Sequence, residues 1–255
     1  MKILIFQPHN NNAIIGMGGT ILKLKEKGAK IVYVYMTDGR HGAELIPEEK
    51  IIEYRKQEGQ DEREFVGIGG YYQFNLEDGT LSKLDDEQKD KPKQKIREII
   101  ETENPNVVFL PSRSNMHEDY KGCHDIVMDV LLQDKPNVLT GKYSVWLMPD
   151  FYEKRKDTPK KVFLMDVTQQ TEKKLQAIKK HISQEREADF AGIANLISEY
   201  YAKIYGTYRK DRAIFRAEVL GFDGTDEDIE KMANLLSAID VTKITHGRKD
   251  AEILD

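Results

Sequence analysis

The residues best suited to chemistry lie in a short polar stretch near the start of the chain. An apolar run at residues 2–7 is followed by Pro8, by His9 and by three asparagines at 10–12. A glycine-rich segment at 16–19 then opens a predicted helix. A strand, a polar loop and a glycine-rich helix start form the usual ligand-binding corner of α/β proteins. This corner has one good metal ligand, but amides stand where metal-assisted hydrolysis needs carboxylates.

Further polar loops supply imidazole and carboxylate groups that could act with His9. The candidates share a place just after a predicted strand: Asp38, Arg40, His41, Asp78, His117, Asp119, Tyr120 and His124. Such groups can hold a metal or exchange protons when they converge. His181 lies outside these loops, and His246 joins them only if the tail folds back. The plain alternative for any single one of these histidines is a solvated surface residue.

Strands and helices are predicted to alternate along most of the chain. β-branched and aromatic runs predict strands, and apolar residues spaced three or four apart among charges predict helices. The predicted strands cover residues 2–7, 30–37, 71–74, 106–111, 143–148 and 162–165. The predicted helices after the first cover 48–66, 86–103, 121–133, 169–182, 187–205 and 226–239. Alternation implies an α/β fold with a mostly parallel sheet, whose strand ends bring the polar loops together.

Composition limits the class of protein. The net charge of −5 argues against nucleic-acid binding. No apolar stretch approaches the roughly 20 residues of a membrane span, so no membrane partner is expected. A single cysteine fits a reducing cytoplasm. The predicted domain covers residues 1–222, and residues 223–255 form a C-terminal helix and charged tail expected to pack on it.

The motifs together resemble the zinc-dependent de-N-acetylases of the PIG-L or LmbE-like family, which act on amino sugars and diacetylchitobiose. The family's Pro-His-Pro-Asp-Asp and Gly-x-Gly-Gly-Thr-Ile correspond to residues 8–12 and 16–21. Its later motifs correspond to Thr37-Asp38-Gly39, Arg55 with Glu58, Asp78, residues 117–124, Asp166-Val167-Thr168 and residues 177–184. The resemblance covers roughly residues 2–220 and implies a Rossmann-like three-layer sandwich.

The same resemblance implies zinc ligands at His9, Asn12 and Tyr120 and a general base at Asn11. The family has His, Asp, His and Asp at these places, so only His9 keeps its chemical type. An amide oxygen is a weak neutral ligand, and a phenol with a pKa near 10 keeps its proton. We therefore expect zinc to be absent or weakly bound, and de-N-acetylation to be impaired.

The residues expected to hold substrate are better preserved. By resemblance, Arg55 and Asp78 would bind sugar hydroxyls or a phosphate, Asp38 would shape its loop, and His117 and Asp119 would support the hydrolytic centre. In plainer terms, Arg55 could be an exposed helix residue paired with Glu58, and Asp78 could be a turn former. The implied ligand is an amino sugar or glycoconjugate, and the implied assembly is a homo-oligomer.

Three functions stay open at this stage. The first is an inactive relative that binds a sugar or regulates a partner. The second is a metal-dependent de-N-acetylase with a rearranged ligand set, such as His9 with His117 or His124. The third is a metal-free reaction that uses His117, Asp119 and His124. A dinucleotide site is disfavoured because the glycine spacing is not Gly-x-Gly-x-x-Gly.

Overall fold

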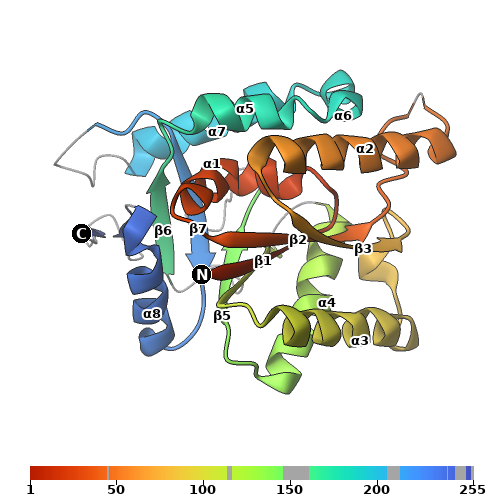
Figure 1. Cartoon of the computed structure of the whole chain (residues 1–255), viewed down its shortest axis with the longest axis horizontal. Coiled ribbons are helices and arrows are strands. Elements are labelled where there is room, and N and C mark those ends of the chain that lie inside the picture. The colour runs from red at the N-terminus through yellow and green to blue at the C-terminus, as the bar shows by residue number, and fades with distance from the viewer. Residues whose placement is uncertain are drawn as a thin grey trace.

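The structure is a computed structural model that describes residues 1–44, 46–113, 117–145, 161–205, 213–239, 241–244 and 251–253. Within these residues a single sheet of nine strands has helices on both faces (Figure 1). The strands are β1 (Lys2–Gln7), β2 (Lys30–Thr37), β3 (Gly70–Leu76), β4 (Val107–Pro111), β5 (Leu139–Tyr143), β6 (Lys161–Asp166), β7 (Ala217–Phe222), β8 (Val241–Ile244) and β9 (Ala251–Ile253). The helices are α1 (Asn12–Glu26), α2 (Glu48–Val66), α3 (Asp86–Glu103), α4 (Glu118–Asp134), α5 (Thr171–Ile178), α6 (Ile182–Glu187), α7 (Phe190–Tyr205) and α8 (Asp226–Leu236).

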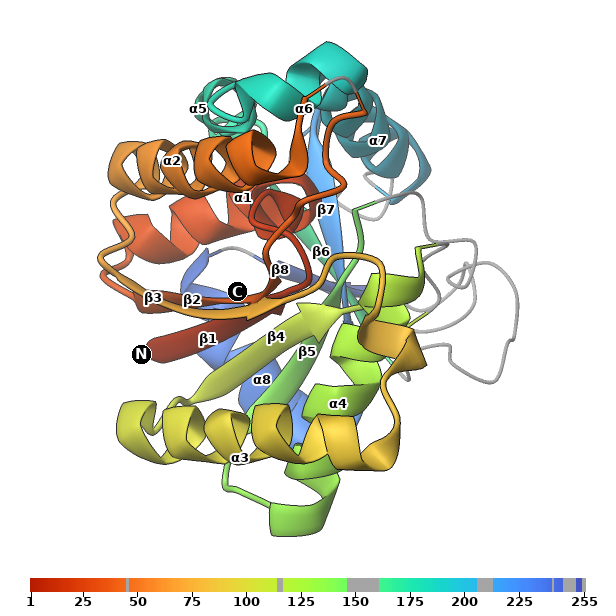
Figure 2. The ribbon, with the colours of Figure 1, turned by 90° about the vertical axis from the view of Figure 1, so that its right-hand side faces the viewer.

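Three layers are visible in both views of the ribbon. Helices α1, α2, α5 and α6 lie on one side of the sheet, and α3 and α4 lie on the other (Figure 2). The buried side chains of α8 belong to the same core as α1. Alternate residues of β1 explain the layering, because Ile3 and Ile5 belong to the core with α1 whereas Leu4 and Phe6 belong to the core with α3 and α4. The three-layer α/β fold predicted from the sequence is thus confirmed.

The strand order places the polar loops at one point. The order is β3-β2-β1-β4-β5-β7-β6-β8-β9, and the first five strands are parallel. The chain passes from β1 outward to β2 and β3 and then returns to β4 on the other side of β1. A sheet of this kind opens a crevice where the strand order reverses, beyond the carboxyl ends of β1 and β4.

The other end of the sheet is antiparallel, and the sequence did not predict it. Strand β7 pairs with β5 and β6, and β8 pairs with β6, so the chain beyond residue 222 returns to the same sheet. The boundary at residue 222 stays a prediction. Strand β5 ends at Tyr143, where the predicted strand 143–148 begins. Strand β5 contains Gly141, and no larger residue fits there because a Cβ would lie 2.4 Å from the ring of Phe109.

Some of the predicted helices begin or end at other residues than the helices of the structure. The segment predicted as one helix at 187–205 is divided between α6 and α7, because Ala188 is extended and Asp189 accepts a hydrogen bond from the Gly192 backbone N–H at 2.7 Å. None of the helices in the described part of the chain is long and apolar enough to cross a membrane. Residues 146–148 of the predicted fifth strand, and His246, lie outside the described residues.

Helix α1 is interrupted where its glycines pack. Met17 has φ −144° and ψ 25°, so the helix restarts after it. The backbone N–H groups of Gly19 and Thr20, freed by this break, donate to the carboxylate of Glu218 at 2.8 and 2.7 Å. The ammonium group of Lys174 lies 2.7 Å from the same carboxylate, and both side chains are 3% exposed. A buried ion pair on β7 and α5 therefore caps the second half of α1.

Candidate functional site

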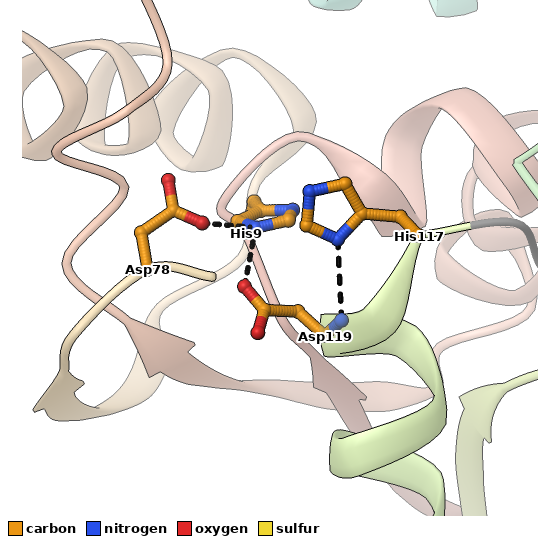
Figure 3. Close-up of side chains that lie close together, drawn as sticks. All are labelled: His9, Asp78, His117 and Asp119. Atoms are coloured by element: carbon orange, nitrogen blue, oxygen red, sulfur yellow. Dashed lines mark hydrogen bonds and ion pairs between the residues drawn. The ribbon is translucent and has the colours of Figure 1, made fainter. Parts of the chain in front are cut away.

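Four side chains from three loops meet beyond the carboxyl ends of β1 and β4. His9 follows β1, Asp78 follows β3, and His117 and Asp119 stand at the start of α4. Each offers one potential ligand atom, and these atoms all lie within 4.8 Å of one another. Figure 3 shows the His9 ring between the two carboxylates, with the His117 ring beside it. The predicted convergence of these loops is thus observed.

His9 is held by both carboxylates through one nitrogen. Its Nε2 lies 2.8 Å from Asp78 Oδ1 and 3.2 Å from Asp119 Oδ2. Asp119 is completely buried, and its carboxylate also accepts backbone hydrogen bonds from Gly79 at 2.7 Å and Leu81 at 3.0 Å. Two carboxylates facing one ring nitrogen need a proton or another cation between them.

The charges around His9 favour a proton on the ring nitrogen that faces the two carboxylates. Burial opposes the charge on His9, but the hydrogen bonds with Asp119 and Asp78 outweigh it and raise the pKa of His9 to about 9. Burial works against ionisation of Asp78 as well, and its hydrogen bond with His9 nevertheless holds the pKa of Asp78 well below the usual range. At neutral pH the centre of the site is therefore an imidazolium bound to two carboxylates.

His117 contributes a neutral ring. It is the N-cap of α4, and its Nδ1 accepts a hydrogen bond from the Asp119 backbone N–H at 3.2 Å. Burial and the neighbouring charge of His9 lower the pKa of His117. Its ring meets the His9 ring edge to face, with centroids 5.1 Å apart. Because Nδ1 accepts, the proton of neutral His117 lies on Nε2, which leaves no free basic nitrogen in this arrangement.

The asparagines after β1 stabilise their own loop. Asn12 Oδ1 accepts from the His9 backbone N–H at 2.8 Å, and Asn12 Nδ2 donates to Asn11 Oδ1 at 3.2 Å. Asn11 Oδ1 also accepts from Arg55 Nη2 at 3.4 Å. Asn10 donates to the backbone oxygen of Arg55. The three amides thus fix the loop against α2, and none of them offers a base.

The ligand set implied by resemblance does not fit a zinc ion. Nε2 of His9 faces Asp78 and Asp119, and the side-chain oxygen of Asn12 is used by the loop backbone. Burial raises the pKa of Tyr120 well above its usual range, so its hydroxyl stays protonated. Zinc takes imidazole, thiolate or carboxylate, and this trio supplies one such group. The cluster of His9, Asp78, His117 and Asp119 has the right donor types, provided that His9 loses its proton.

Arg55 is a buried residue of this site. Its side chain is 2% exposed, which rules out the exposed helix residue considered from the sequence. Glu58, its proposed partner, accepts from the Ser183 backbone N–H at 2.6 Å and hydroxyl at 2.8 Å. Burial lowers the pKa of Arg55 to about 10, against the opposing charges of Glu58 and Asp78. Its Nε and Nη1 have no hydrogen-bond partner within the described structure.

A cavity of about 360 Å³ opens over the cluster. It is lined by His9, Asn11, Asn12, Ile15, His41, Gly42, Ala43, Glu44, Arg55, Asp78, Gly79, His117, Tyr120, Val145, Gln184, Glu187 and Phe190. Ile15, Val145, Glu187 and Phe190 had no sequence signal as site residues, because apolar and charged helix residues are common elsewhere. His41 takes part through its backbone, whose N–H donates to Asp78 Oδ2 at 3.2 Å.

Two predicted site residues lie away from this cavity. Asp38 accepts hydrogen bonds from the Arg40 guanidinium at 3.0 and 2.7 Å and lines a neighbouring cavity. His124 is buried, and its Nδ1 lies 2.9 Å from the backbone oxygen of Pro111. The structure therefore brings together His9, Arg55, Asp78, His117 and Asp119, and it separates His124 from them.

Comparison with known proteins identifies the family of the chain. Residues 4–131 match the PIG-L family, GlcNAc-PI de-N-acetylase. The chain is 25% identical over 222 residues to a diacetylchitobiose deacetylase of Thermococcus kodakarensis, with 80% of this chain and 79% of the relative covered.

Solved structures share the fold. An N,N'-diacetylchitobiose deacetylase from Pyrococcus horikoshii superposes with a TM-score of 0.67 at 22% identity, covering 86% of this chain and 82% of its own. A 4-carboxy-2-hydroxymuconate hydratase from Pseudomonas putida KT2440 has a TM-score of 0.68 at 18% identity, covering 86% and 95%. The fold thus accommodates more than one reaction, and the family match is what places this sequence: the chain belongs to the PIG-L family and is LmbE-like and de-N-acetylase-like.

Proposed function

We propose that the protein is a catalytically inactive relative of the de-N-acetylases that binds an amino sugar or glycoconjugate in the cavity over His9. One observation carries the proposal. Arg55 is buried at the wall of this cavity with two N–H groups unpartnered in the described structure, while the base and ligand positions hold amides and a phenol. A buried guanidinium with unused donors is suited to acceptor oxygens of a ligand.

The loss of catalysis follows from the chemistry of the replaced groups. Asn11, at the position of the family's base, is neutral, and its oxygen already accepts from Arg55 and Asn12. A positioned base contributes about 10²–10⁴-fold to such a reaction, and a metal that activates water contributes more. Without either, a bound amide would be held but not hydrolysed.

Binding remains chemically reasonable in the same cavity. Asp78 is ionised and oriented by His9 and by the His41 backbone, so it can accept a hydrogen bond from a sugar hydroxyl. Arg55 can donate from the lining of the same cavity. A sugar ring offers both kinds of partner, which explains how the binding part of the site would outlast the hydrolytic part.

Two measurements test the proposal. One is calorimetric titration of metal-free protein with diacetylchitobiose, and the other is an acetate-release assay with and without zinc. We expect saturable binding and no acetate release. Arg55→Met should weaken binding by about tenfold or more, since a hydrogen bond to a charged group contributes about 1.5–3 kcal/mol. Arg113→Met, which alters an ion pair with Asp125 outside this cavity, is the matched control. Turnover at an ordinary enzymatic rate of about 1–10³ s⁻¹ would overturn the proposal.

A second candidate is a metal-dependent de-N-acetylase with a rearranged ligand set. The cluster of His9, Asp78, His117 and Asp119 favours it, whereas the version with His124 loses support because His124 is bound to Pro111. Elemental analysis of untagged protein separates the two candidates. About one zinc per chain that is lost in Asp78→Asn would favour the rearranged enzyme.

The metal-free reaction receives less support. His124 is outside the cluster, and Nδ1 of His117 already accepts the Asp119 backbone N–H. The cytoplasmic location and the homo-oligomer stay predictions, the second of which light scattering can test.

A further inference from the structure

A second cavity, of about 440 Å³, shares Arg55 with the cavity over His9. It lies among β2, β3 and α2, and Figure 2 shows these elements next to one another at one edge of the molecule. Among the described residues, Arg55 alone is common to the linings of the two cavities. Nothing in the proposed sugar site accounts for the second cavity.

The lining of the second cavity is rich in cations. Arg55, Lys56 and Arg63 face two acidic residues, Asp38 and Glu53. Asp38 is already neutralised by Arg40, whose Nη2 lies 2.7 Å from its carboxylate. The chain as a whole carries −5, so a concentration of positive charge runs against the average of the molecule. Such a concentration attracts anions.

One of the cations is fixed in place, and another is exposed. Arg63 is 7% exposed, and its Nη1 donates to the Tyr35 hydroxyl at 3.1 Å. Its guanidinium carbon lies 3.8 Å from the centroid of the Tyr71 ring, which is half exposed at the cavity. A guanidinium held by stacking and one hydrogen bond keeps further N–H donors for a ligand. Lys56 is exposed and has no ion-pair partner among the described side chains, so it can close on a bound group.

Arg55 supplies a further sign of a missing ligand, on the side of its guanidinium that borders the second cavity. Its Nε has no hydrogen-bond partner in the described part of the chain, and it borders Gly39, where a Cβ would come within 3.1 Å of it. Gly39 lines only the second cavity. The side-chain oxygen of Asn10, also in this lining, is likewise buried and unpartnered there. Buried polar atoms of this kind are few in native proteins and call for a partner.

We propose that this second cavity binds a small molecule through an oxyanion, a phosphate or a carboxylate, placed between Arg55, Lys56 and Arg63. Arginine forks match both oxyanions in geometry, and a flexible lysine adds a third charge. The site does not depend on the sugar-binding proposal, because Lys56, Arg63 and Tyr71 lie outside the cavity over His9.

The test is calorimetric titration of the full chain with sodium phosphate and, separately, with sodium acetate, at an ionic strength held constant with chloride. Saturable binding of one anion per chain is expected, and comparison of the two salts tells which oxyanion the cavity prefers. Lys56→Gln should weaken that binding by about tenfold, as expected for one lost charged hydrogen bond. Lys50→Gln, a change of the same charge on the same helix outside both linings, should leave it unchanged.

Two results would overturn the proposal. One is the absence of saturable binding for both anions, and the other is an equal loss in the Lys50 and Lys56 variants, which would mean general attraction to the surface. Titration of Lys56→Gln with diacetylchitobiose keeps the two proposals apart. Unchanged sugar affinity together with weakened anion affinity supports separate sites, whereas loss of sugar binding with unchanged anion affinity overturns the anion site.

Discussion

The loop after β1 and the loops after β3 and β4 face each other across one imidazole, yet they differ in charge. The first, at residues 10–12, has three amides that bind backbone and one another. The others present Asp78 and Asp119, and both carboxylates contact His9. The carboxylates that contact His9 therefore come from the β3 and β4 side.

If the protein is the metal-free relative proposed above, this difference explains how the site keeps its shape. Two carboxylates left at the centre would repel each other, but a protonated His9 between them supplies the positive charge that they need. The amides of Asn11 and Asn12 cost little, because each finds a hydrogen-bond partner within its own loop or in Arg55.

The largest effect is expected from the carboxylate side. Asp119→Asn removes a buried charge that pairs with His9 and accepts from Gly79 and Leu81, so it should lower the free energy of unfolding by about 3 to 5 kcal/mol. Urea unfolding measures it. Asp125→Asn on the same helix breaks only a partly exposed pair with Arg113 and should cost at most about 1 kcal/mol. Equal costs would show that Asp119 has no special role.

The pairing of His9 predicts that stability falls as the pH rises. The pKa of His9 is about 9 in the folded chain, against 6.5 for an unpaired imidazole. Because folding favours the protonated form, the stabilisation is complete below pH 6.5 and is lost as His9 deprotonates through about pH 9. Its size is on the order of 3 kcal/mol. Urea unfolding at intervals from pH 6 to 10 measures the decline.

Another buried group titrates in an overlapping range. Burial raises the pKa of Glu62 from 4.5 to about 8, so it too loses stabilisation as the pH rises. The difference between the parent protein and His9→Gln isolates the part due to His9. A difference that does not change with pH would contradict the proposed imidazolium.

Restoring charge to the amide side is expected to restore zinc binding. The change Asn11→Asp, Asn12→Asp and Tyr120→His recreates the family's residues at these positions. Without metal, the new carboxylates repel each other and lower the melting temperature. Zinc at 100 times its dissociation constant should then stabilise the variant by about 2.7 kcal/mol, whereas the parent should show no shift. Thermal melts with and without zinc decide this. A folded variant that ignores zinc would mean that the loop geometry has changed as well.

The smallest effects are expected from removing single amides. Asn12→Ala leaves the His9 backbone N–H without its 2.8 Å partner and should cost about 1 kcal/mol. Asn11→Ala breaks longer contacts of 3.2 and 3.4 Å and should cost less. Chemical denaturation of the two variants ranks them. The reverse order would argue against a supporting role for the Asn12 amide.

Much of the fold could be predicted, because the spacing of apolar residues along the sequence reflects which side of a helix or strand is buried. The predicted helices at 48–66 and 86–103 coincide with α2 and α3. The antiparallel end was missed because β7 carries a buried Glu218 and Gly221 within an apolar run, which breaks the pattern of a strand. Glu218 is explained only by distant partners, α1 and Lys174, and a local pattern contains no information about them.

The site, like the fold, could be predicted in part. Placement after strands located His9, Asp78 and His117 at one edge of the sheet, and the structure brings them together with Asp119. Their pairing could not be predicted, since loop sequences do not fix which side chains touch. Arg55 illustrates the same limit, because its helix is charged enough to look exposed while the residue itself is buried.

The capping of α1 by Glu218 bears on how this protein is made. The helix beside the site begins at Asn12, yet two amides of its second half are satisfied by a residue of β7. A ribosome releases the segment that matches the family, residues 4–131, well before that strand. During synthesis those amides and the surface around them therefore have no partner until residue 218 has been made. The recognisable family segment is consequently not a unit that completes its folding alone, and an early stop codon before residue 218 would leave its helix unfinished rather than yield a smaller working protein.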